Sequence, residues 1–131
     1  MTDRLRFDNP DGVHRPLGPY SHTVVVPRGA ELVWTAGQIG MRPDGTVGET
    51  MAAQADQAFA NVVALLDAHG LGVSSIVRLT VFIVAGQDGE PVRAARVKHL
   101  GVHEPVSSTV YVSQLVRPEW LVEVEAIAAA T

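Results

Sequence analysis

The segment from Ile76 to Val84 (IVRLTVFIV) constrains the fold of this chain more than any other part of the sequence. In a β-strand, side chains alternate between the two faces of the sheet. The odd positions from 77 to 83 are all apolar, and positions 76, 82 and 84, which would lie on the opposite face, are apolar as well. We therefore expect a strand that is buried on both faces.

Other segments predict the elements around this strand. The apolar, β-branched stretches 21–26 (SHTVVV) and 31–36 (ELVWTA) flank the turn residues 27–30 (PRGA), which predicts an antiparallel hairpin. Apolar residues then recur at steps of three and four from Thr50, a candidate N-cap, to Gly70. The remaining expected elements are a second helix at Pro91–Leu100 and strands at Ser107–Val112 and Leu121–Ala128.

The predicted order is β-β-α-β-α-β-β, an α/β (α+β) arrangement in a single domain over residues 1–131. Two helices can cover only one face of a sheet, yet the strands are apolar on both. A partner subunit would cover the second face, and a sheet that curls on itself is the alternative.

Composition excludes several function classes. Ten Lys and Arg against fourteen Asp and Glu give a net charge of −4, and the sequence has no basic stripe of the kind that binds nucleic acid. The absence of cysteine excludes a disulfide framework, a thiolate nucleophile and a cysteine metal site. The five histidines lack metal-ligand spacing, so we expect no metal. With no apolar run long enough for a membrane span and no signal-peptide pattern, we expect a soluble, cytoplasmic protein.

Three short segments carry a resemblance to a known family. They are Gly18-Pro19-Tyr20-Ser21, Ala36-Gly37-Gln38-Ile39 and the C-terminal run VEVEAIA at 122–128, with LTVF at 79–82 between them. In this order and spacing, residues 17–128 resemble the Rid (reactive-intermediate deaminase, YjgF-like) family. The resemblance implies a chorismate-mutase-like fold with two helices on one face of a mixed sheet. It also implies a homotrimer in which three sheets meet in a central barrel, with small-molecule clefts at the subunit interfaces.

The same resemblance implies a chemistry. Family members hydrolyse enamines and imines released by pyridoxal-phosphate enzymes, giving 2-keto acids and ammonia, without a metal or other cofactor. An arginine binds the substrate carboxylate, and a glutamate near the C-terminus helps to hold the attacking water. Some relatives are called endoribonucleases or translation inhibitors, but the acidic balance of this chain argues against RNA as its ligand.

The residues of the implied cleft depart from the family pattern. The family's Arg-Ser-Cys/Thr-Val falls on residues 107–110 (SSTV), so that Ser107 stands where the arginine is expected. An expected asparagine is Arg93, an expected serine is Ala36, and the stretch before Ser107 is several residues short. Ser107 and Thr109 would line the cleft from one side of their strand. Their hydroxyls carry no charge, so affinity for simple 2-imino acids should fall.

The other candidate residues each allow two interpretations. Glu123 would position the water, although with Glu125 it could simply form a solvated edge face. Tyr20 would lie over a ligand or pack as a half-buried aromatic side chain. The amide of Gly37 would face a ligand carboxylate, or the glycine would mark a strand bulge. Arg93 would restore the missing cation, or be an ordinary surface arginine.

Two functions therefore remain open at this point. One is an imine or enamine deaminase with an altered substrate range. The other is a ligand-binding or regulatory trimer without catalysis, which the loss of the arginine favours.

Overall fold

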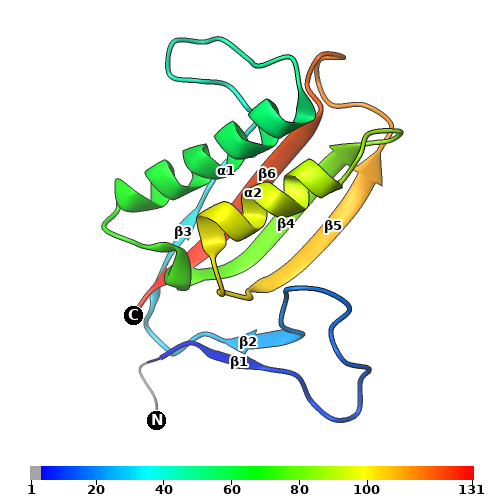
Figure 1. Ribbon diagram of the computed structural model, residues 1–131. Helices are drawn as coiled ribbons and strands as arrows, with labels where there is room; N and C mark the ends of the chain where they lie inside the picture. The colour runs from blue at the N-terminus through cyan, green and yellow to red at the C-terminus, as the bar shows by residue number, and fades with distance from the viewer. Residues whose placement is uncertain (1–3) are drawn as a thin grey trace.

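The computed structural model describes residues 4–131 and contains two α-helices on one face of a mixed sheet (Figure 1). The elements in chain order are β1 (Arg6–Asp8), β2 (Thr23–Val25), β3 (Glu31–Trp34), α1 (Met51–Asp67), the 3₁₀ turn η1 (Val73–Ser75), β4 (Ile76–Val84), α2 (Glu90–Leu100), β5 (Val106–Val112) and β6 (Val122–Ala130). The fold class and the two helices predicted from the sequence are confirmed.

The main sheet has the strand order β3-β6-β4-β5. Only β4 and β5 are parallel, because α2 carries the chain back between them, whereas β6 pairs antiparallel with both β3 and β4. This order makes β4 and β6 inner strands. It leaves β5 at one edge, beside α2, where the chain can form a cleft.

The predicted hairpin of residues 21–26 and 31–36 is wrong. β2 pairs with β1, a short strand that the sequence analysis did not predict, and β3 pairs with β6. The turn between them does form, with Gly29 at φ +85° and a hydrogen bond from Ala30 N to Pro27 O. This turn does not decide the pairing, because β3 joins the main sheet, where Val33 packs against the core.

The core lies between α1 and the helix-facing side of the sheet. Thr50 caps α1 as predicted, since its side chain accepts a hydrogen bond from Ala53 N at 3.1 Å. Phe59, Val62 and Leu66, at steps of three and four, are fully buried. They pack against the alternate residues of β4 and β6, namely Leu79, Val81, Ile83, Val122, Val124 and Ala126.

The opposite face of the sheet is only partly covered by the chain itself. Arg78, Thr80, Phe82 and Val84 alternate with the core residues of β4 and have intermediate exposure. On β3, Trp34 lies on this same face and is 68% exposed. The expected burial of β4 on both faces is thus met on the helix side alone. Among residues 4–131, neither helix has the length and apolarity to cross a membrane.

Candidate functional site

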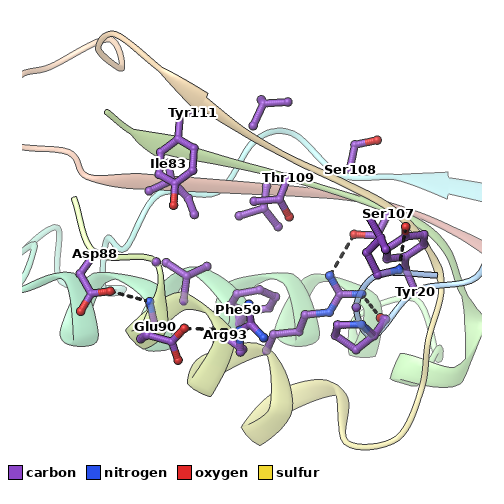
Figure 2. A pocket seen from close by; sticks show the side chains of 18 residues that line it. Tyr20, Phe59, Ile83, Asp88, Glu90, Arg93, Ser107, Ser108, Thr109 and Tyr111 are labelled. Carbon is purple, nitrogen blue, oxygen red and sulfur yellow. Dashed lines mark hydrogen bonds and ion pairs between the residues drawn. The ribbon is translucent and has the colours of Figure 1, made fainter. Parts of the chain in front are cut away.

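A cavity of about 730 Å³ lies between α2 and β5 (Figure 2). Its floor is apolar and comes from Phe59 of α1 and from Val81 and Ile83 of β4. Its polar wall comes from β5 and from the loop at residues 17–20, which precedes β2. Four of the six residues proposed from the sequence, Tyr20, Arg93, Ser107 and Thr109, line this cavity.

The pleat of β5 aims alternate side chains into the cavity. Ser107 and Thr109 lie opposite Leu79 and Val81 of β4, both of which face the helices. Figure 2 shows Ser107 and Thr109 on the side of the strand toward α2, and Ser108 on the other side. The hydroxyl of Ser108 instead accepts a hydrogen bond from Arg78, at 2.9 Å, on the far face of the sheet.

Tyr20 is held at one end of the cavity by its own loop. Its hydroxyl accepts a hydrogen bond from Leu17 N at 3.1 Å, and its ring meets His22 edge-on, with centroids 5.6 Å apart. The next residue, Ser21, ties the loop to the start of β5, because its amide donates to Pro105 O and its hydroxyl to Glu104 O. Tyr20 and Ser107 therefore both line the cavity from the side of this loop and the start of β5.

Arg93 lies at the rim of the cavity. Its side chain is 67% exposed and forms an ion pair with Glu90 at 3.7 Å, one turn earlier on α2. The carboxylate of Asp88 accepts a hydrogen bond from Glu90 N in the same region (Figure 2). This end of the cavity therefore carries two carboxylates and one guanidinium.

A second arginine on α2 lies inside the cavity and was missed by the sequence analysis. Arg96 is only 9% exposed; its Nη1 donates to Ser107 Oγ at 2.9 Å and its Nη2 donates to Pro19 O. Burial lowers its pKa, and the charge of Glu104 opposes that effect in part. A sequence signal existed, because Val92, Arg96 and Leu100 lie four residues apart and so share the buried face of α2.

Gly37 and Glu123 lie together, but away from this cavity. Glu123 alternates with the core residues Val122 and Val124, so its side chain points to the face of the sheet opposite the helices. Gly37 precedes Gln38, whose backbone exchanges hydrogen bonds of 2.7 and 2.9 Å with Val124. A Cβ atom on Gly37 would lie 2.4 Å from Glu123 Oε2, so any residue other than glycine would displace this carboxylate.

The six residues proposed from the sequence thus form two groups on opposite faces of one sheet. One group lines the cavity with Arg96, and the other places a carboxylate beside Gly37. Among residues 4–131 there is no group of three or more His, Asp or Glu side chains arranged to hold a metal ion.

Comparisons with known proteins give a consistent result. The sequence profile of the family described as endoribonuclease L-PSP matches residues 12–130. The 2-iminobutanoate/2-iminopropanoate deaminase of Salmonella typhimurium is 37% identical over 116 residues, which cover 86% of this chain and 88% of that protein.

Solved structures agree in fold. A Rid-family protein of unknown function, YyfB from Yersinia pestis, superposes with a TM-score of 0.83 at 27% identity, over 96% of this chain and 98% of that one. TdcF from Escherichia coli, solved with bound serine, has a TM-score of 0.72 at 29% identity, over 96% and 99% of the two chains.

Proposed function

Because the chain belongs to the endoribonuclease L-PSP (Rid, YjgF-like) family, we propose that it hydrolyses small imines or enamines that carry a carboxylate. The products would be a 2-keto acid and ammonia. The relatives named 2-iminobutanoate/2-iminopropanoate deaminase favour this chemistry over a ligand-binding role without catalysis.

The observation that carries the proposal is the composition of the cavity. One end offers the hydroxyls of Ser107 and Thr109 and the guanidinium of Arg96, and the floor is apolar. An anionic head on a short carbon chain matches these two environments, because hydrogen-bond donors fix the orientation of a ligand and apolar surface binds its chain. Bound serine in TdcF is a ligand with such a head.

The hydrolytic step needs a group that accepts a proton from water. As the water oxygen bonds to the imine carbon, one of its protons passes to the Glu123 carboxylate. Glu123 returns this proton to the imine nitrogen to give a tetrahedral carbinolamine. The proton of its hydroxyl group then passes to the nitrogen as well, and the carbon–nitrogen bond breaks to release ammonia. The adduct's oxygen becomes the keto oxygen, so the imine and one water account for both products.

A single chain places Glu123 on the face of the sheet opposite the cavity, so a complete site needs a second copy of the chain. We expect a homotrimer, in which the open face of each sheet is covered and Glu123 of one copy faces the cavity of its neighbour. The partly exposed Phe82 and the exposed Trp34 on this face are consistent with such an interface.

The test generates the imine in place. An amino-acid oxidase acting on alanine or leucine releases the 2-imino acid, and semicarbazide traps it as a semicarbazone that is measured by absorbance. The protein should lower the yield of semicarbazone by hydrolysing the imine first. The Glu123→Gln variant should lose this effect by a factor of about a hundred or more.

Glu125→Gln is the matched control, since Glu125 lies two residues along on the same face of β6 and should retain activity. Wild-type protein that leaves the semicarbazone yield unchanged would overturn the proposal. If such a protein still binds 2-keto acids, the ligand-binding function takes its place.

A further inference from the structure

We propose that Arg96 binds the substrate carboxylate, and that the cavity selects 2-imino acids whose side chains are apolar and longer than that of 2-iminobutanoate. This inference rests on the proposed function and names the substrate class of the same site. It assigns the recognition to a helix residue, whereas the family resemblance places the carboxylate-binding arginine on β5, at the position of Ser107.

The first argument is an unbalanced buried charge. Arg96 lines the cavity and is only 9% exposed as a residue, yet no Asp or Glu oxygen among residues 4–131 lies within 4.0 Å of its side-chain nitrogens. A buried cation is unfavourable unless an anion or enough hydrogen bonds compensate for the lost water. Both of its hydrogen-bond partners are neutral oxygens, and the charge of Glu104 offsets the effect of burial only in part, so a ligand carboxylate would supply a direct countercharge.

The second argument is orientation. A guanidinium has five N–H groups, and Arg96 uses one for Ser107 Oγ and one for Pro19 O, which leaves three donors. These contacts join α2, β5 and the loop before β2, so the side chain is fixed before a ligand arrives. A fixed, planar fork binds a carboxylate through two parallel hydrogen bonds with little further loss of conformational entropy.

The third argument concerns the rest of the ligand. Val92 lies one helical turn from Arg96, about 6 Å along the axis, and with Phe59, Val81 and Ile83 it gives the cavity an apolar middle. In the single chain the cavity has a volume of about 730 Å³, so this apolar middle has room for a carbon chain longer than that of a four-carbon imino acid.

The far end of the cavity argues against a second acidic group on the ligand. Asp88 and Glu90 lie there, and the guanidinium of Arg93 already pairs with Glu90 (Figure 2). A side chain that carries its own carboxylate would meet like charge at this end. The cavity therefore favours neutral, apolar side chains such as those derived from leucine or methionine.

The test measures binding, which does not depend on turnover. Isothermal titration calorimetry would compare 4-methyl-2-oxopentanoate with its uncharged primary amide. The wild-type protein should bind the acid at least tenfold more tightly than the amide. Arg96→Gln should weaken binding of the acid at least tenfold and leave the amide unchanged, with Arg96→Lys between the two because it keeps the charge but loses the fork.

Two further variants make the result specific. Arg117→Gln removes an arginine that stacks on Trp120 outside the cavity, and it should bind both ligands as the wild type does. Circular dichroism and thermal unfolding establish that each variant is folded. A folded Arg96→Gln variant that binds the acid normally would overturn the inference, as would a loss of acid binding in Arg93→Gln without a loss in Arg96→Gln.

A ligand series tests the substrate class. Affinity should rise at least tenfold from 2-oxobutanoate to 4-methyl-2-oxopentanoate, and 2-oxoglutarate should bind most weakly. Tightest binding of 2-oxoglutarate would refute the selection of apolar side chains. Glu123→Gln separates the two proposals, because it should bind the keto acid normally but not hydrolyse imines. If the wild-type protein binds keto acids through Arg96 but hydrolyses no imine, only the proposed function is overturned.

Discussion

Replacing Gly37 by Ala should disable the Glu123 carboxylate without unfolding the protein. The added Cβ would lie 2.4 Å from Oε2, 2.7 Å from Cδ and 3.0 Å from Cγ of Glu123. The closest of these distances is 1 Å short of 3.4 Å, where ordinary van der Waals contact begins. Since φ of Gly37 is not positive, alanine meets no backbone strain, and the whole effect comes from this contact.

The cost of Gly37→Ala depends on how far the Glu123 side chain can move away from the added Cβ atom. The Glu123 side chain is flexible and only partly buried, so it can rotate away, and we expect the free energy of unfolding to fall by only about 1 kcal/mol. The carboxylate, however, must shift by about 1 Å. A displacement of that size commonly lowers the rate of a positioned catalytic step by about a hundredfold.

The assay pairs thermal unfolding with the semicarbazone competition. We expect a melting temperature about 4 °C lower and imine hydrolysis reduced about a hundredfold. Gly72→Ala is the control, because φ of Gly72 is −98° and its Cβ would meet no atom within 4 Å. A folded Gly37→Ala variant that hydrolyses imines at the wild-type rate would refute the role given to Glu123.

Three further predictions test the assembly, the core and the helix pair. The protein should scatter light as a trimer at micromolar concentration and Trp34→Glu should dissociate it, whereas a stable wild-type monomer would contradict the shared site. Gln54→Met should lower the free energy of unfolding by about 3 kcal/mol in urea titrations, because this 1% exposed side chain accepts from Leu121 N at 2.8 Å and donates to two loop carbonyls. Hydrogen bonds from Lys98 and His99 lower the pKa of Asp56 in the folded state. The stability that these bonds provide is therefore complete above the unfolded-state pKa of about 3.9 and is lost as the pH falls through the lower folded-state pKa. Asp56→Asn should therefore be less stable than wild type at pH 7, and the difference should shrink as the pH falls below about 3.9. A difference in the free energy of unfolding that stays constant down this pH range would argue against this coupling.

Much of the fold could be predicted from local patterns. The alternation along β4 and the three- and four-residue steps of α1 predicted both elements within a few residues, since each pattern depends only on near neighbours. The pairing of β3 could not be predicted in this way. A turn at 27–30 is equally compatible with a hairpin and with a chain that passes to another sheet. The structure shows the second arrangement, in which β3 pairs with β6 and Val33 packs against the core.

The candidate site likewise contains residues that local patterns could place and residues that they could not. Alternation alone placed Ser107 and Thr109 on one side of a strand, and the structure places both in the cavity. Alternation could not reveal that Glu123 lies on the opposite face, because the relative facing of β5 and β6 is set through their registers with β4.

By itself, the sequence determined the class of fold, the family and the absence of an arginine at position 107, because these depend on residue identity and short-range periodicity. Only the tertiary structure decided which cation lies beside Ser107. Arg96 meets Ser107 across 11 residues and Pro19 across 77, and no local pattern links such positions. Their contact results from packing α2 over β5, which buries one arginine of the helix and leaves Arg93 in solvent.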